Sequence, residues 1–210
     1  MDKYAVTVDT FNRLADKYQS KYMDFAFYQD TYDIFCSLLT SRQARIFEIG
    51  CGPGNISKYI LDKHADLRLH GIDLAPNMVT LARQNNPHAT FEVMDSREIG
   101  SINESYDAVI CGFCTPYLAK NDVAKLIRDI RQLLNTGGIL YLSTMEGDDA
   151  GSGLQTSSAG DQVFIHYHQF EFLKSELTAN DFELLNVVRK QFPVESGDPA
   201  TDLFIYAKAV

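Results

Sequence analysis

The sequence predicts an α/β protein in which a mainly parallel sheet carries helices on both faces. Over residues 44–144, short apolar segments typical of buried strands alternate with longer segments whose apolar residues repeat at helical spacing. Such alternation is typical of parallel strands joined by crossover helices. A loop with three glycines, Gly50, Gly52 and Gly54, directly follows the first strand segment. With 210 residues and 45% hydrophobic content the chain can bury one substantial core, so we expect a single domain, residues 1–210.

Two amphipathic helices are expected ahead of the glycine-rich loop, and together they would form an N-terminal cap over residues 1–43. In each, apolar side chains recur at intervals of three and four residues, which places them on one helix face. The first set is Phe11, Leu14, Ala15, Tyr18 and Tyr22, and the second is Tyr28, Tyr32, Phe35, Cys36 and Leu39.

The central part of the chain, residues 44–144, supplies the strands and helices of the predicted sheet. Pro76 suits the first turn of a helix, and Gly137 with Gly138 suits the end of one. Strands are expected at residues 44–50, 67–73, 89–95, 106–112 and 137–143, and helices at residues 55–64, 75–86 and 121–135.

The last part, residues 145–210, changes in character. The segment 143–161 is rich in glycine and serine and is expected to be a long flexible connection, of the kind that often forms a lid or binding loop. A strand at 161–169 and a helix at 170–180, ended by Asn180 in the left-handed conformation, would follow. Two terminal strands, 182–192 and 202–210, complete the expected fold.

Charge and composition limit the classes of partner that we expect for this chain. The net charge of −9 disfavours a nucleic-acid partner, because phosphate binding needs clustered Lys and Arg. The sequence shows no apolar run near twenty residues and no signal-peptide pattern, so we expect a cytoplasmic protein without membrane contact. Its four cysteines fit no disulfide framework. A small molecule is the expected partner, and the sequence indicates no oligomeric state.

The glycine-rich loop indicates a ligand at the carboxyl end of the first strand, where open α/β sheets bind ligands. A nicotinamide-dinucleotide fingerprint would need its third glycine at the position of Asn55. Glu48, two residues before the loop, suits a cationic ligand better than a phosphate. Asp73 lies 19 residues after Gly54, and a carboxylate there can accept both hydroxyls of a ribose. The residues alone therefore indicate a ribosyl ligand, with dinucleotide and adenosyl compounds both open.

The ordered motif series narrows this choice. "IFEIGCGPGN", "GIDLAPNM", "FEVMDS", "YDAVICGF" and "LLNTGGILYLST" occur in that order between residues 44 and 144. The series resembles that of the class I S-adenosylmethionine-dependent methyltransferases, and is similar to the small-molecule branch that includes ubiquinone and biotin-pathway enzymes. The resemblance implies a Rossmann-like, doubly wound, seven-stranded sheet of order 3-2-1-4-5-7-6 with strand 7 antiparallel. It also implies S-adenosylmethionine as cofactor and S-adenosylhomocysteine as product.

The resemblance also implies roles for individual residues. Glu48 would act on the ammonium end of the cofactor, Asp73 on the ribose and Asp95 on the adenine amino group, with the Ser96 backbone N–H beside the ring. The wall against the methionine and ribose parts of the cofactor would be formed by Gly50, Cys51, Gly52 and Gly54. The ribose and adenine would be bordered by Leu74 and Met78. The methionine part would also face the end of the fourth strand, at Cys111 and Gly112.

Candidate catalytic and substrate-binding residues come from other segments. His166 and His168 lie two apart on an expected strand, so both imidazoles would face the same side and one could serve as general base. Tyr18, Tyr22 and Tyr117 are candidates for an aromatic substrate pocket. The alternatives are ordinary strand histidines and aromatic residues that only pack the cap onto the sheet.

No metal site is expected. Cys111 and Cys114 form a single C-x-x-C pair without a second pair, and the acidic loop residues Glu146, Asp148 and Asp149 are typical of solvated loops. The predicted function is methyl transfer to an oxygen, nitrogen or carbon nucleophile of a small molecule. Two alternatives stay open: a non-catalytic adenosyl-binding module and a nicotinamide-dependent oxidoreductase.

Overall fold

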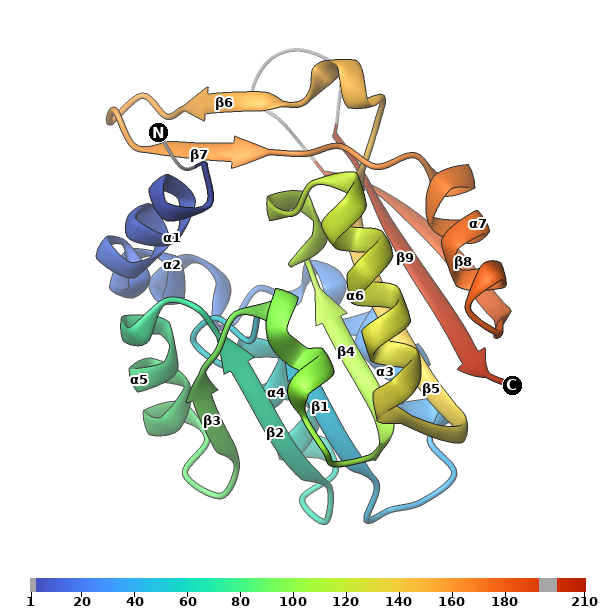
Figure 1. The fold of residues 1–210 in the computed structure, drawn as a ribbon. Coiled ribbons are helices and arrows are strands. Elements are labelled where there is room, and N and C mark those ends of the chain that lie inside the picture. Colours follow the sequence, from blue (N-terminus) through green and yellow to red (C-terminus); the bar gives the residue numbers. More distant parts are fainter. Residues whose placement is uncertain (1–2, 193–199) are drawn as a thin grey trace.

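A computed structural model describes residues 3–192 and 200–210 and shows a seven-stranded sheet of order β3-β2-β1-β4-β5-β9-β8 (Figure 1). β1 pairs in parallel with β2 and β4, β2 with β3, and β4 with β5, whereas β9 is antiparallel to both β5 and β8. This confirms the predicted order, with β8 and β9 as the sixth and seventh strands of the sheet. The strands are β1 (Arg45–Ile49), β2 (Arg68–Asp73), β3 (Thr90–Val93), β4 (Tyr106–Gly112), β5 (Leu134–Glu146), β8 (Phe182–Phe192) and β9 (Ala200–Ala209).

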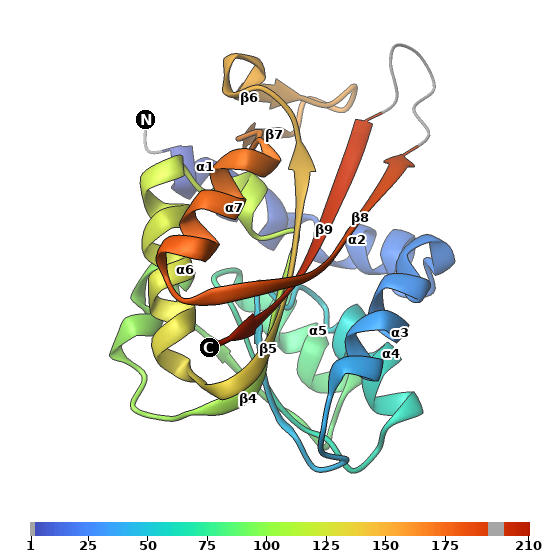
Figure 2. The same ribbon diagram turned by 90° about the vertical axis from the view of Figure 1, so that its right-hand side faces the viewer.

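Helices cover both faces of this sheet (Figure 2). One apolar core lies between the sheet and α3, α4 and α5, and the other lies between the sheet and α6 and α7. Strand alternation supplies both cores: in β1, Ile46 belongs to the first core and Phe47 and Ile49 to the second. The helices are α1 (Lys3–Arg13), α2 (Ala15–Tyr22), α3 (Gln29–Leu38), α4 (Asn55–Lys63), α5 (Pro76–Asn85), α6 (Lys120–Leu133) and α7 (Phe170–Ala179), with short 3-10 turns η1 (Ala26–Tyr28), η2 (Ser96–Ser101), η3 (Thr115–Tyr117) and η4 (Asp149–Gly151).

A cap lies across the carboxyl ends of the parallel strands (Figure 1). It consists of α1, α2 and a separate hairpin of β6 (Gly153–Thr156) and β7 (Gln162–Ile165). The Thr10 hydroxyl donates to the Gln162 carbonyl at 2.7 Å, and the Phe164 N–H donates to the Thr7 hydroxyl at 3.0 Å. Arg13 forms an ion pair with Asp161 at 2.8 Å. The hairpin and the N-terminal helix therefore hold one another over the sheet.

Two expectations about the last third of the chain are wrong. Residues 143–161 are not one flexible connection, because β5 continues to Glu146 and β6 pairs with β7 in the hairpin. The strand expected at 161–169 ends at Ile165 and lies outside the main sheet. Local apolar alternation does not reveal which partner a strand will have, and the pairing decides where each strand ends.

Two helix boundaries also differ from expectation. The first predicted helix is interrupted at Leu14, where φ and ψ are −99° and 15°, although the Leu14 and Tyr18 N–H groups keep helical hydrogen bonds across the break. At the end of α7 the left-handed residue is Asp181, with φ of 56°, and Asn180 keeps φ at −112°. Both Asn and Asp tolerate this conformation, so the sequence does not distinguish adjacent positions.

Candidate functional site

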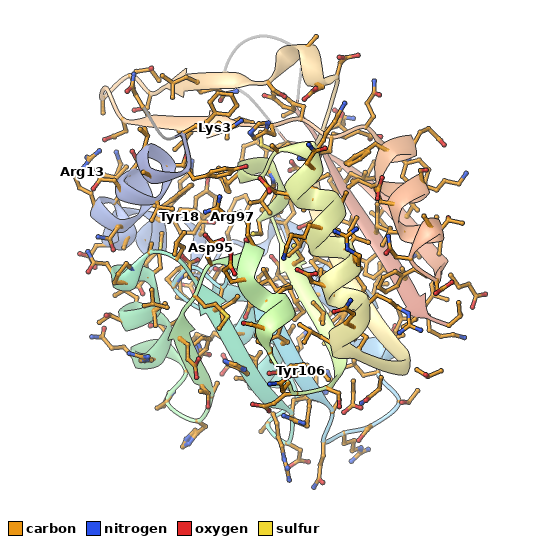
Figure 3. The ribbon with its side chains drawn as sticks, viewed as in Figure 1. Lys3, Arg13, Tyr18, Asp95, Arg97 and Tyr106 are labelled. Atoms are coloured by element: carbon orange, nitrogen blue, oxygen red, sulfur yellow. The ribbon has the colours of Figure 1, made fainter. Side chains whose placement is uncertain are left out.

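A cavity opens at the carboxyl ends of β1, β2 and β4, beneath α1. It encloses about 870 Å³ of space outside the atoms, a figure that includes the part open to solvent. Figure 3 shows Tyr18, Asp95 and Arg97 at this end of the sheet, with Tyr106 at the opposite end. The predicted residues that line it are Tyr18, Gly50, Gly52, Asp73, Leu74, Met78, Asp95, Ser96, Gly112 and Tyr117.

The glycine-rich loop turns three times through the left-handed region. Gly50, Gly52 and Gly54 have φ of 68°, 54° and 79°. A Cβ at Gly52 would have only Tyr18 and Asn55 atoms near it, at 3.8 and 3.9 Å, so the backbone here faces the cavity without a side chain. Gly54 has a different task, since a Cβ there would collide with the Asn86 amide. Gly54 therefore packs the loop onto α5 rather than lining the cavity.

Asp73, the last residue of β2, is held by the backbone around it. The Gly52 N–H donates to its Oδ2 and the Ala75 N–H to its Oδ1, both at 2.9 Å. Burial raises the pKa of this carboxyl, and the N–H groups of Ala75, Gly52 and Leu74 oppose that rise. The bond to Ala75 also caps α5, where Ala75 itself has no capping side chain. Each oxygen retains acceptor capacity for a ligand in the cavity.

Asp95 lies in a cluster that includes a residue the sequence reasoning did not single out. The Arg97 guanidinium donates to both carboxylate oxygens, at 3.0 Å from Nε and 2.5 Å from Nη2, and lies 4.3 Å from the centre of the Tyr4 ring. Burial alone would raise the pKa of Asp95, but the Arg97 side chain and backbone N–H bring it below its ordinary value. The Tyr4 hydroxyl also donates to Asp122 on α6, so α1 is held against this cluster.

Glu48 lies behind the glycine-rich loop. Its side chain is buried, the Ser57 hydroxyl of α4 donates to Oε2, and Oε1 has no hydrogen-bond partner among the residues that the structure describes. Burial raises the pKa of this carboxyl to about 8, with a further rise from the charge of Asp73. Cys51 and Cys111 are also buried. None of Glu48, Cys51 and Cys111 lines the cavity beneath α1, and Cys51 lines a neighbouring cavity instead.

A second cavity adjoins the first and encloses about 1080 Å³ on the same measure. Aromatic side chains from α2, η1, α3 and the segment after β4 dominate its lining. Tyr22 lines this cavity only, whereas Tyr18 and Tyr117 line both. The two cavities share the residues Tyr18, Gly50, Gly52, Gly112, Phe113 and Tyr117.

Phe113 lies at this junction in an unusual conformation. Its φ of 52° is rare for a residue with a side chain, and its N–H donates to the Ser143 hydroxyl at 3.0 Å. Such conformations concentrate at functional sites, where the surrounding structure holds them. Asp202 of β9, on the wall of the second cavity, is likewise a residue that sequence reasoning missed. Its signal was a single carboxylate at the start of an apolar strand.

His166 and His168 share one side of the chain, as predicted, with rings stacked at 6.4 Å between centres. Neither belongs to the described lining of the two cavities. His168 is fully buried, and its Nε2 lies 3.0 and 3.1 Å from the carbonyl oxygens of Thr115 and Leu118. Burial lowers the pKa of both imidazoles, so each is neutral near pH 7. The contacts of His168 hold η3, which carries Tyr117 to the junction.

Neither arrangement considered for metal binding forms a site in the described part of the chain. No group of three or more His, Cys, Asp or Glu side chains lies close enough together there to hold an ion. Glu146 accepts from Arg189 at 2.6 and 2.9 Å, and Asp149 pairs with Lys120 at 3.4 Å. All four cysteines are free thiols. Within the same residues, no helix is long and apolar enough to cross a membrane.

Fold and site together define an α/β protein with a cavity at the carboxyl ends of its parallel strands, lined by the glycine-rich loop and by Asp73 and Asp95. Comparison with known proteins agrees. A methyltransferase domain family matches residues 46–138. An uncharacterised methyltransferase of Bacillus subtilis, YdaC, is 30% identical over 149 residues, covering 66% of this chain and 81% of that protein. The chain therefore belongs to the class I S-adenosylmethionine-dependent methyltransferases.

Other relatives match over a smaller part of their length. The malonyl-[acyl-carrier protein] O-methyltransferase of Acetivibrio thermocellus is 34% identical over 101 residues, which is 47% of this chain and 35% of that protein. The chain thus spans about a third to a half of the first curated relatives it matches. Among solved structures, the magnesium protoporphyrin IX methyltransferase of Synechocystis superposes with a TM-score of 0.74 at 18% identity, over 100% of this chain and 98% of that one. This likeness supports the fold.

Proposed function

We propose that the chain binds S-adenosylmethionine in the cavity beneath α1 and transfers its methyl group to a small molecule in the adjoining aromatic cavity. The observation that carries the proposal is the junction: a ribose-suited carboxylate, Asp73, lies on one side, and the two cavities share Gly50, Gly112, Phe113 and Tyr117. A cofactor and an acceptor held on either side of such a junction would meet at their reacting atoms.

The residues present fit this cofactor. The Asp73 carboxylate has acceptor capacity for the ribose hydroxyls, and Asp95 has capacity for the adenine amino group beyond its bonds to Arg97. Gly52 presents bare backbone, and Met78 and Leu74 present apolar surface to the cavity. The cofactor supplies a methyl group that its sulfonium already activates. What remains for the protein is to hold acceptor and cofactor in line, which can contribute about 7 to 11 kcal/mol.

The proposal covers an oxygen, nitrogen or carbon nucleophile of the small molecule. Similar structures include a magnesium protoporphyrin IX methyltransferase and a 1,6-didemethyltoxoflavin N1-methyltransferase, so this fold serves different acceptor molecules. The general-base role of His166 or His168 stays a prediction, and the contacts of His168 support a role in positioning η3 instead. The free thiols and the charge of −9 support a cytoplasmic protein without a nucleic-acid partner.

Two alternatives differ from this function in ways that can be measured. A non-catalytic adenosyl-binding module would bind the cofactor and methylate nothing in a broad panel of small acceptors. A nicotinamide-dependent oxidoreductase would bind NAD or NADP. Asn55 in place of the third fingerprint glycine disfavours the second alternative.

Ligand-dependent thermal unfolding tests the proposal first. S-adenosylmethionine or S-adenosylhomocysteine at about 100 times its dissociation constant should stabilise the chain by about 2.7 kcal/mol. For a domain of this size that corresponds to a rise in Tm of roughly 5 to 11 °C. NAD and NADP at the same concentration should cause no shift. A shift with the nicotinamide compounds alone would overturn the proposed cofactor.

A further inference from the structure

Few charged side chains line the second cavity in the described part of the chain. Among its described lining residues, Asp202 is the only aspartate or glutamate, and no lysine or arginine contributes. Aromatic rings surround the space on several sides. The lining aromatic residues are Tyr18, Tyr22, Phe25, Tyr28, Tyr32, Phe113, Tyr117 and Phe192.

Only one of the two carboxylate oxygens of Asp202 has a hydrogen-bond partner among the described residues. Its residue is 3% exposed, and the Tyr28 hydroxyl donates to Oδ2 at 2.5 Å. No other hydrogen bond to this carboxylate is formed by the described residues, which leaves Oδ1 without a partner. Lys190 pairs with Asp202 across the strands, but its ammonium group binds Asp30 at 2.6 Å and the Phe27 carbonyl at 2.7 Å instead. The ammonium group of the cross-strand neighbour of Asp202 is thus bound to other partners.

A buried carboxylate with a free oxygen is costly unless a cation or a donor compensates it. A ligand ammonium group would supply both the charge and the N–H donors. Aromatic faces also attract cations, and a desolvated contact of this kind contributes up to about 2 kcal/mol. A carboxylate or phosphate ligand would instead meet the like charge of Asp202 without an arginine or lysine in the described lining to offset it.

We propose that the acceptor is an organic amine whose ammonium group is recognised by Asp202 and the surrounding aromatic rings. This inference rests on the proposed function, because it treats the second cavity as the acceptor site. It names a substrate class that separates this chain from relatives whose names specify an acyl-carrier protein as the substrate. Tyr28 is the positioning residue, since its hydroxyl fixes one oxygen of Asp202 and leaves the other for the ligand.

A matched series of probes tests the charge preference in the unmodified protein. 2-Phenylethylamine, 2-phenylethanol and 3-phenylpropionate carry the same ring on a positive, neutral and negative end. Calorimetric titration into the full chain, with S-adenosylhomocysteine present, should show the amine binding about tenfold more tightly than the alcohol. The carboxylate should bind more weakly than the alcohol. Equal binding of all three, or tighter binding of the carboxylate, would overturn the inference without any mutation.

Two variants then test whether Asp202 is the residue that causes the preference for the amine. Asp202→Asn should bring the amine to within about threefold of the alcohol. Asp24→Asn removes the same charge from an exposed position that makes no ion pair among the described residues, and should keep the tenfold preference. Retention of that preference in Asp202→Asn would overturn the assignment. Both variants are first titrated with S-adenosylhomocysteine to show that they are folded.

The same titrations separate this inference from the proposed function. Binding of S-adenosylhomocysteine without any preference for the amine would overturn the amine site and leave the methyltransferase proposal standing. Absence of S-adenosylhomocysteine binding, with the amine preference intact, would overturn the proposed function and leave Asp202 as a cation site.

Discussion

At the scale of single residues, Asp73 shows how backbone geometry prepares a binding group. Two N–H groups at 2.9 Å point its carboxylate into the cavity before any ligand arrives. Little reorganisation is then needed on binding, which is how a rigid site gains affinity. The left-handed glycine-rich loop supplies one of these donors, from Gly52.

Asp73→Asn should therefore weaken binding of S-adenosylmethionine by about 1.5 to 3 kcal/mol, the scale of a hydrogen bond to a charged group. Calorimetric titration measures the change. Asp66→Asn, at an exposed position in the loop before β2, is the control and should bind normally. A folded Asp73→Asn chain with unchanged affinity would contradict the ribose assignment.

The raised pKa of Glu48 predicts how the stability of the fold depends on pH. Its pKa is about 8 in the folded chain against an ordinary 4.5, so between these values the folded state holds a proton that the unfolded state has lost. Stability should fall as pH rises through this interval, by up to about 1.4 kcal/mol per pH unit, and the loss should be complete above pH 8.

Glu48→Gln removes this titration. Urea unfolding at pH 5.5, 6.5 and 7.5 should show the variant gaining stability relative to the unmodified chain at each step. Other titrating groups are common to both proteins and cancel in the difference. A difference that is constant with pH would mean that Glu48 does not stay protonated in the fold.

At the scale of elements, the cap depends on a few polar contacts between α1 and the β6–β7 hairpin. Thr10 and Thr7 are buried in this interface, and their hydroxyls bond to the backbone of β7. Since α1 covers the first cavity, the strength of these contacts should control how easily that cavity opens. Elements with few such contacts open locally far below the global unfolding free energy.

Thr10→Val keeps the shape of the side chain but removes its bond to the Gln162 carbonyl, at a cost of about 1 kcal/mol. We expect faster amide hydrogen exchange in α1 and β7 and a roughly fivefold faster release of S-adenosylmethionine. Ser20→Ala removes an exposed bond to the Asp16 carbonyl at 2.9 Å and should leave release unchanged. Equal exchange in Thr10→Val and the unmodified chain would show that this bond does not hold the cap.

At the scale of the whole molecule, two cores share one sheet. Ile60 of α4 belongs to the core on one face and Leu177 of α7 to the core on the other, and both are fully buried. Because the same strands supply both cores, neither core can form without the sheet. This arrangement supports the prediction that residues 1–210 unfold as one unit.

Ile60→Ala and Leu177→Ala should each lower the free energy of unfolding by about 2 to 5 kcal/mol. Each should retain a single transition, with coincident midpoints by circular dichroism and tyrosine fluorescence. Leu154→Ala, at a side chain 52% exposed, is the control and should change stability by about 0.5 kcal/mol or less. Two separate transitions in either core variant would contradict a single domain.

Much of this fold is visible in the sequence. Apolar periodicity and the glycine-rich loop place β1, α4, β2 and α5 within a few residues of their observed bounds. The order of the strands in the sheet could not be predicted from the spacing of these segments. It was implied by the resemblance to a family. The hairpin was missed because β6 is short and largely exposed, so it carries no apolar signal.

The residues of the candidate site likewise differ in how far the sequence indicates where they lie. Gly52 and Asp73 belong to two of the quoted motifs, and both line the cavity beneath α1. Glu48 and Cys111 belong to the same series of motifs, yet both are buried and neither lines this cavity. A motif position specifies a residue's neighbours along the chain, but packing decides whether its side chain reaches the ligand.

By itself the sequence determined the fold class and predicted a ribosyl ligand at the carboxyl end of the first strand, because strand periodicity, glycine spacing and carboxylate placement are properties of consecutive residues. The choice of S-adenosylmethionine came from the resemblance to a family. Only the tertiary structure decided the chemistry of the second cavity. Tyr28 and Asp202 are 174 residues apart, and Arg97 reaches Tyr4 across most of the N-terminal half. Such contacts depend on the strand order and on the docking of the cap, and no local pattern specifies either.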